Sequence, residues 1–294
     1  MKKQTIFSPT ARLGYGFPME SFEAGMAKAP DVIAVDGGST DPGPYYLGSG
    51  KSFTDRLAVK RDLSIMIQAA LKAGIPVIVG SSGGSGAGSH LKWCQEIVME
   101  IADEEKLKFK LALIEADIDK ELIKKKLKTG QVKPLHPAKQ LKTEDVEAAT
   151  NVVAQMGLEP MVEALNNRAD VILAGRAYDP TSFAALAAKE GMNLGLALHL
   201  GKILECAAIA STPGSGSDCM IGYLYEDCFK IEPLSPIRKC TTLSVAAHTL
   251  YEKTNPYILP GPGGTLDLSE TTFHQETESM VKVCGSRFIP SDKY

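Results

Sequence analysis

The sequence lacks the long apolar runs, the excess of one charge and the leader that mark several large classes of protein. No run of roughly 18 or more apolar residues occurs, which argues against a transmembrane helix. Lysine and arginine total 32 against 35 acidic residues, so the net charge of −3 does not favour nucleic-acid binding. The N-terminal MKKQTIFSPTARLG has no apolar secretory core. We therefore expect a cytoplasmic protein that binds neither membranes nor nucleic acids.

Several compact chemical motifs are also missing. The six cysteines contain no CxxC pair, so their scatter indicates free thiols rather than a disulfide framework or a zinc site. Neither the HExxH motif of zinc proteases nor the GxSxG motif of α/β-hydrolases occurs. Gly50-Lys51-Ser52 resembles the end of a phosphate-binding loop, but Tyr45 stands where that motif requires glycine. This mismatch argues against an ATPase.

Short apolar runs alternate with helical patterns through the first two thirds of the chain. Four runs predict buried strands, at 31–35, 76–79, 109–114 and 170–174. Helical patterns lie between and after them, at about 19–29, 53–73, 91–102, 120–128, 143–156, 159–167, 181–190 and 196–210. This alternation predicts an α/β fold whose βαβ units form a Rossmann-like, doubly wound parallel sheet.

The pattern changes after residue 211. Short runs in the last 80 or so residues alternate polar and apolar side chains, as antiparallel strands do. We therefore expect an α/β domain at 1–211 and a smaller, β-rich α+β region with antiparallel strands at 212–294. The linker-like STPGSGSD at 211–218 is the expected boundary. Because the alternation continues almost to Tyr294 with no closing helix, we expect the second region to be incomplete.

Four loops that follow predicted strands contain the most reactive side chains. Ligands of open α/β sheets bind at the carboxyl ends of strands, where such loops meet. The first loop, 36–51, is longer than the usual turn of about 2–6 residues, and loops of that length tend to be functional. Its candidates are Asp36, Ser39, Thr40, Asp41, Tyr45 and Tyr46. Asp36 is the best candidate for an acid that faces a ligand, and the alternative is that it caps a turn.

The second loop, GSSGGSGAG at 80–88, has small residues that allow backbone N–H groups to approach an anion. A helix is predicted directly after it, and the N-terminus of a helix attracts negative charge. The loop therefore predicts a phosphate or carboxylate cradle, with tight packing as the alternative. Its candidates for binding substrate are Ser81, Ser82, Gly83 and Gly84.

A dinucleotide site is a weaker hypothesis for the same loop. The third glycine of GxGxxG is replaced by Ser89. The acidic residues about 20 positions further on, Asp103 and Glu104, precede the next predicted strand, whereas a ribose would need an acid at its end. An oxidoreductase that uses NAD(P) therefore ranks below the anion cradle.

The third loop contains Glu115 and Asp117. Their carboxylates face a common cleft, or Asp117 caps the next helix. Together with Asp36 and Asp41 they offer oxygen ligands of the type that Mg²⁺ prefers. Mg²⁺ is thus a compatible cofactor, although no spacing identifies a metal.

The fourth loop, Gly175-Arg-Ala-Tyr-Asp-Pro180, places Arg176 where an anionic substrate would meet a bidentate partner. Asp179 and Pro180 instead predict the N-cap and first residue of the following helix. Further along, His199, Lys202 and Cys206 have the spacing of one helical face. His199 and Lys202 are catalytic candidates, whereas a buried Cys206 is more typical of a core.

Five segments together carry a resemblance to a known family: RLGYGFP at 12–18, DVIAVDGGSTDPGPYYLGSGKSF at 31–53, DVILAGRAYD at 170–179, GKILEC at 201–206 and SVAAHTLYE at 244–252. The chain resembles the AtuA-type acyclic terpene utilisation family from about residue 12 to Phe288. The resemblance implies a role in the degradation of acyclic terpenoids and branched acids, often beside acyl-CoA enzymes. It carries over motif positions rather than assigned roles, and adds Glu205 and His248 as lesser candidates.

The resemblance and the loops together predict a lyase or hydro-lyase that acts on a small branched carboxylate or its CoA thioester. An acid of the first loop with Tyr45 or Tyr46 would move the proton. Members of the family usually continue beyond the point where this chain ends, so we also expect a small C-terminal-domain partner protein. The alternative is a non-catalytic binding or assembly subunit whose site that partner completes. A homo-oligomer is expected for an enzyme of this kind.

Overall fold

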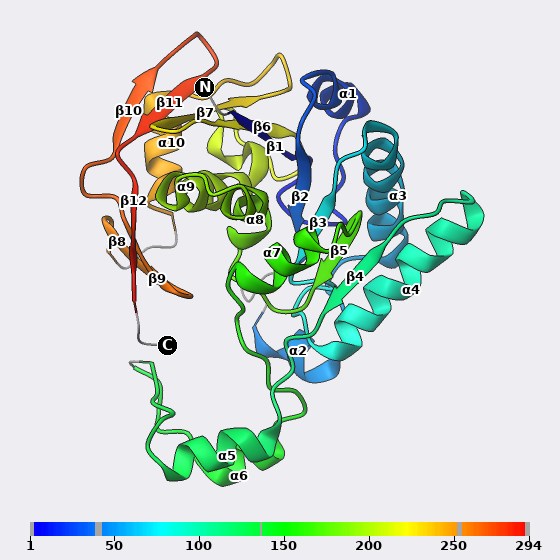
Figure 1. The fold of residues 1–294 in the computed structure, drawn as a ribbon, viewed down its shortest axis with the longest axis vertical. Coiled ribbons are helices and arrows are strands. Elements are labelled where there is room, and N and C mark those ends of the chain that lie inside the picture. The colour runs from blue at the N-terminus through cyan, green and yellow to red at the C-terminus, as the bar shows by residue number, and fades with distance from the viewer. Residues whose placement is uncertain (1–2, 39–42, 136, 252–254, 292–294) are drawn as a thin grey trace.

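The computed structural model describes residues 3–38, 43–135, 137–251 and 255–291, and its main feature is one large mixed sheet (Figure 1). In spatial order its strands are β10 (Thr272–Gln275), β11 (Val281–Cys284), β7 (Cys228–Pro233), β6 (Met220–Leu224), β1 (Gln4–Ser8), β2 (Val32–Asp36), β3 (Val77–Gly80), β5 (Val171–Ala174) and β4 (Leu111–Ile114). The strands from β1 to β4 pair in parallel, whereas β6, β7, β11 and β10 continue from β1 in antiparallel pairs.

A second, antiparallel sheet lies near the C-terminus. It consists of β12 (Arg287–Pro290), β9 (Gly264–Asp267) and β8 (Ile258–Gly261). The predicted fold class, a doubly wound α/β core followed by a smaller region with antiparallel strands, is therefore confirmed.

Helices cover both faces of the large sheet. One face packs against α1 (Met19–Ala27), α3 (Arg56–Ala73) and α4 (Gly88–Glu104), and the other against α7 (Glu159–Asn166), α8 (Thr181–Lys189), α9 (Leu194–Leu204) and the 3₁₀ turn η1 (Ala207–Ala210). Because side chains alternate along a strand, Ile33 and Val35 enter the first layer while Val32 and Ala34 enter the second. Strands buried on both faces need continuous apolar runs, which is why the sequence displayed them.

The remaining helices are α2 (Pro44–Ser49), α5 (Lys120–Lys128), α6 (Thr143–Ala148) and α10 (Thr242–Thr249). The predicted helix at 143–156 was too long, because the chain after Ala148 turns extended and Val153 and Met156 form bridges to Asp117 and Ala177. The predicted helix at 53–73 starts later, at Arg56, where the Asp55 side chain accepts the N–H bonds of the first turn.

The sequence interpretation missed β1. Its residues QTIFS include three polar side chains, yet all five are buried because β1 lies in the middle of the sheet between β6 and β2. The pairing of β1 with β6 also joins residues on both sides of 211–218 in one sheet. None of the helices in the described residues is long and apolar enough to cross a membrane.

Candidate functional site

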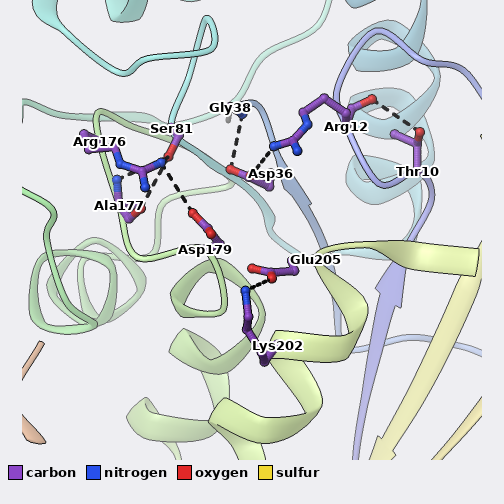
Figure 2. A network of polar contacts seen from close by, with 10 residues as sticks. All are labelled: Thr10, Arg12, Asp36, Gly38, Ser81, Arg176, Ala177, Asp179, Lys202 and Glu205. Atoms are coloured by element: carbon purple, nitrogen blue, oxygen red, sulfur yellow. Dashed lines mark hydrogen bonds and ion pairs between the residues drawn. The ribbon is translucent and has the colours of Figure 1, made fainter. Parts of the chain in front are cut away.

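Asp36 is the last residue of β2 and lies at the carboxyl edge of the parallel strands, opposite Gly80 of β3. Its side chain is almost fully buried, with 2% of its surface exposed. Arg12 Nη1 donates to Asp36 Oδ2 at 2.9 Å, and the Gly38 N–H donates to Asp36 Oδ1 at 3.3 Å (Figure 2). The carboxyl therefore both accepts a hydrogen bond from the loop that follows β2 and forms a partly buried ion pair.

Arg176 approaches the same edge from the loop after β5. Its Nη1 donates to Ser81 Oγ at 3.3 Å and lies 3.4 Å from Asp179 Oδ1. Its backbone N–H donates to the Gly86 carbonyl, so the second and fourth loops are joined directly. Both side-chain contacts of Arg176 are long, and a guanidinium has five N–H donors. Arg176 can thus bind an anion without giving up a strong bond.

Lys202 and Glu205 come from the end of α9 and form a buried ion pair with each other. Figure 2 shows this pair below Asp36 and Asp179. We call the six charged residues the ion cluster: Arg12, Asp36, Arg176, Asp179, Lys202 and Glu205. Three acids thus meet three bases, drawn from four separate parts of the chain.

The ion cluster changes the proton affinity of its members. Burial raises the pKa of Asp36 well above its ordinary value, and the charges of Asp179 and Glu205 raise it further, while Arg12 opposes the shift. Burial lowers the pKa of Lys202, but the Glu205 carboxylate outweighs that effect and leaves it above the ordinary value. Asp36 is therefore favoured to hold its proton, whereas Lys202 keeps its charge.

Tyr178 adds a phenol to this site. Burial raises its pKa to about 12, with the Lys202 charge lowering it and the Glu205 and Asp179 charges raising it. The hydroxyl of Tyr178 consequently stays protonated and can donate a hydrogen bond.

The glycine-rich loop lets three loops approach closely. A Cβ on Gly38 would lie 1.8 Å from the Gly84 carbonyl oxygen, and a Cβ on Gly86 would lie 2.1 Å from the Arg176 nitrogen. Gly86 also has a positive φ of 69°, which favours glycine. The structure thus packs this loop tightly against the first and fourth loops, and it places Ser81 against Arg176.

The contacts of the other residues predicted in that loop are with groups outside the ion cluster. The Ser82 N–H donates to the Ala174 carbonyl, and Gly83 and Gly84 turn with positive φ against His90 and Phe53. At the start of α4, a Cβ on Gly88 would lie 3.2 Å from Asp117 Oδ2, so a carboxylate of the chain itself lies beside that helix N-terminus.

The structure does not bring the two predicted tyrosines into the ion cluster. Tyr45 is largely exposed on α2, and the ring of Tyr46 packs edge-on against Tyr45 and Phe53. Ser39, Thr40 and Asp41 lie outside the described residues.

His199 lies elsewhere as well. It is fully buried, its Nδ1 is 2.7 Å from Ser286 Oγ, and its Nε2 is 3.0 Å from Thr249 Oγ1. Its ring also packs edge-on against Phe229 and Phe273. These contacts hold α9 to α10 and the C-terminal strands. Of the predicted stripe, Lys202 belongs to the ion cluster, and Cys206 lies close enough to raise the pKa values of Arg12 and Lys202.

Sequence reasoning missed three members of the site. Arg12 follows the unpredicted strand β1, so no loop was expected there. Asp179 was predicted to cap α8, but no side chain caps that helix, and Asp179 pairs with Arg176 instead. Tyr178 was passed over because nothing in its local sequence shows that Lys202 and Glu205 lie nearby. Glu205 was signalled only by the family resemblance.

No group of three or more His, Cys, Asp or Glu side chains within the described ranges has the geometry to hold a metal ion. The acids proposed for Mg²⁺ are divided, since Asp36 is buried in the ion cluster while Glu115 and Asp117 are exposed near α4.

Comparison with known proteins gives one match. A family model described as "Acyclic terpene utilisation family protein AtuA" matches residues 50–217, which is more than half of the chain. The matched range contains six residues of the site: Ser81, Arg176, Tyr178, Asp179, Lys202 and Glu205. Comparisons with curated proteins and with solved structures found no match.

Proposed function

Since the chain belongs to the AtuA family of acyclic terpene utilisation proteins, we propose that it is a lyase or hydro-lyase in acyclic terpenoid or branched-acid catabolism. Its substrate is a small branched carboxylate or the corresponding CoA thioester. The observation that supports this activity best is Asp36, a buried carboxyl with raised pKa between two arginines at the carboxyl edge of the sheet. Proton transfer during elimination requires a group of this kind.

In this proposal Arg176 binds the acidic end of the substrate. Arg12 is committed to Asp36 at 2.9 Å, whereas the contacts of Arg176 with Ser81 and Asp179 are 3.3 and 3.4 Å. A carboxylate that replaces them gains two parallel, charge-assisted bonds from the guanidinium. Ser81 stays within reach to position the same group, as predicted for the second loop.

The proton steps of a dehydration follow from the two aspartates. Asp179 removes the proton on the carbon next to the carbonyl, and its Oδ1 accepts no hydrogen bond from the described residues. The electron pair of that C–H bond forms the new double bond as the C–O bond breaks. Asp36, protonated because of its raised pKa, gives its proton to the departing hydroxide, which leaves as water. Lys202 stabilises the negative charge that develops on the carbonyl oxygen.

A second candidate function is a non-catalytic binding or assembly subunit. Its support is that the six charges of the ion cluster already form three ion pairs, as a purely structural network does. In that case a partner protein supplies the chemistry and the ion cluster holds the loops that meet it.

Ligand binding and turnover with two variants distinguish these functions. We expect one branched acid or thioester from a panel to raise the melting temperature of the wild-type protein and to be consumed. Asp36→Asn should keep that thermal shift and lose turnover by about 100-fold or more. Arg176→Gln should lose the shift itself.

The control is Asp31→Asn, a carboxyl at the opposite end of β2 that accepts the Thr5 N–H. Wild-type turnover in Asp36→Asn would overturn the assignment of Asp36 as the group that transfers the proton. A ligand that shifts the melting temperature but is never consumed would favour the binding subunit.

A further inference from the structure

The segment between β4 and α7 leaves the body of the molecule as an arm. Figure 1 shows α5 and α6 side by side, away from both sheets. No residue of α5 is buried, and Leu122 and Leu135 are 46% and 86% exposed. The arm therefore exposes apolar surface that nothing in the described chain covers.

The part of the arm formed by α5 and the loop after it is strongly basic, whereas α6 carries the acids Glu144, Asp145 and Glu147. Residues 120–142 contain eight lysines and a single acidic residue, Glu121. Lys124 is neutralised by Glu121 and Glu147, whereas Lys125, Lys126 and Lys128 are exposed and make no ion pair within the described residues. With eight of the 32 basic residues gathered here, the rest of the chain is markedly acidic. A basic, partly apolar surface on an acidic protein favours an acidic, partly apolar partner.

That partner surface is present on the same chain. The outer face of α4 has a hollow of about 490 Å³ lined by Glu96, Glu100, Asp103, Glu104 and the half-exposed Met99, among others. Glu100 is bound by Arg56 and Lys60 of α3 and Glu104 by Lys60, and Lys92 also lines the hollow. Glu96 and Asp103 make no ion pair within the described residues. We call these five residues the acidic face. In Figure 1 the far end of α4, where Asp103 and Glu104 lie, is well separated from the arm of its own chain.

The edge of the large sheet lies next to both surfaces. Among the described strands, β4 pairs with β5 alone, and its sequence LALI has no proline or charge of the kind that protects natural edge strands. Leu113 is 41% exposed there. Since β4 leads directly into the arm, the free edge, the arm and α4 form one continuous side of the molecule.

We propose that this side is the interface of a homodimer, in which the α5–α6 arm of each copy docks on the acidic face of the other. The lysines of the arm meet Glu96 and Asp103, and Leu122 approaches Met99. A reciprocal exchange of this kind closes as a twofold dimer and leaves no surface free for further growth. A membrane is a poorer occupant, because Ile123 and Leu127 of α5 are partly covered and cannot both insert into lipid. The interface is independent of the proposed reaction.

Charge reversal with mixing tests this interface. The arm variant is Lys125→Glu, Lys126→Glu and Lys128→Glu, and the face variant is Glu96→Lys and Asp103→Lys; all five positions are exposed. Sedimentation velocity at micromolar concentration should show a wild-type dimer. Each variant alone should dissociate about tenfold more readily or worse, because like charges then oppose each other twice. An equimolar mixture of the two variants should dimerise again, since both contacts are then of opposite sign.

The control is a pair of exposed lysines outside the interface, Lys72→Glu and Lys239→Glu, which should dimerise like the wild type. Three results would each overturn the interface: a monomeric wild-type protein, a dimer that neither variant weakens, or a mixture that stays monomeric. Binding of the monomeric protein to vesicles of anionic lipid, lost in the arm variant, would assign the arm to membranes instead.

Discussion

Asp36 illustrates how a single side chain obtains its properties from distant residues. The position directly after a buried strand was enough to select it as a candidate. Its pKa is shifted by burial and by three neighbours. Asp179 comes from the loop after β5, Arg12 from the loop after β1 and Glu205 from the end of α9. None of these distances can be read along the chain.

The raised pKa of Asp36 predicts how stability depends on pH. The folded state binds this proton more tightly than the unfolded chain, whose aspartates have a pKa near about 3.9. The stabilisation from Asp36 is therefore complete below the unfolded pKa and is lost as the pH rises through the folded pKa. Asp36→Asn lacks this loss, so the free energy of unfolding of the wild type minus that of the variant should fall as the pH rises above about 4. Urea titrations of both proteins at several pH values measure this difference.

The same titrations with Asp31→Asn give the comparison for a carboxyl at the other end of β2. If the free energy of unfolding of the wild type minus that of Asp36→Asn instead grows with pH, the raised pKa is contradicted. Asp36 is then a carboxylate stabilised by Arg12.

At the scale of elements, the site depends on loops that touch through glycine backbone. Gly86 joins the second loop to the fourth, because its carbonyl accepts the Arg176 N–H and its position leaves no room for a Cβ. The glycines of the loop 80–88 were identified from the sequence, but their spacing fits an anion cradle and tight packing equally well. The contact between Gly86 and Arg176 shows that the loop also positions this arginine.

Gly86→Ala should therefore displace Arg176 as well as destabilise the fold. A side chain at positive φ costs about 1–2 kcal/mol by itself, and overpacking against the Arg176 backbone adds about 1–3 kcal/mol. The matched control is Gly74→Ala, which has the same φ of 69° but no atom within 4 Å of the new Cβ. Denaturant unfolding should give the larger loss for Gly86→Ala, and only this variant should weaken the ligand-induced thermal shift. Equal losses in both variants would contradict the close packing of the two loops.

At the scale of the whole molecule, the large sheet joins the two ends of the chain. β1 from the N-terminus pairs with β2 on one side and with β6 on the other, and β7, β11 and β10 follow in the same sheet. The strands β6, β7 and β11 also share an apolar layer with α8 and α9. The predicted boundary at 211–218 would make the parts before and after it separate folding units, which an unfolding experiment can test.

Cooperative unfolding is the expected outcome of this arrangement. We predict a single calorimetric transition, with Val79→Ala in β3 and Val283→Ala in β11 each lowering the same melting temperature by several degrees. Leu57→Ala at the start of α3, where the side chain is 72% exposed, is the control and should leave it unchanged. Two transitions, each sensitive to only one of the buried substitutions, would establish separate folding units.

Much of the fold was predictable because its signals are local. The strands β2, β3 and β5 are short apolar runs, and α5 has the bounds that its sequence pattern predicts. The strand β1 was not predictable, since Gln4, Thr5 and Ser8 are polar and only their central place in the sheet buries them. With β1 unseen, Arg12 could not be assigned to a loop at the carboxyl edge.

The sequence by itself determined the α/β architecture, the resemblance to one family and the selection of Asp36, Ser81, Arg176 and Lys202. Each of these depends on residues within a few positions of one another, where periodicity and strand ends are visible. Only the tertiary structure decided that these four lie together with Arg12, Asp179 and Glu205 and that His199 lies elsewhere. The physical reason is that parallel strands bring loops together that are up to about 190 residues apart in the chain. Charge interactions depend on the distances between these residues in space, and those distances cannot be read from the order of the residues in the chain.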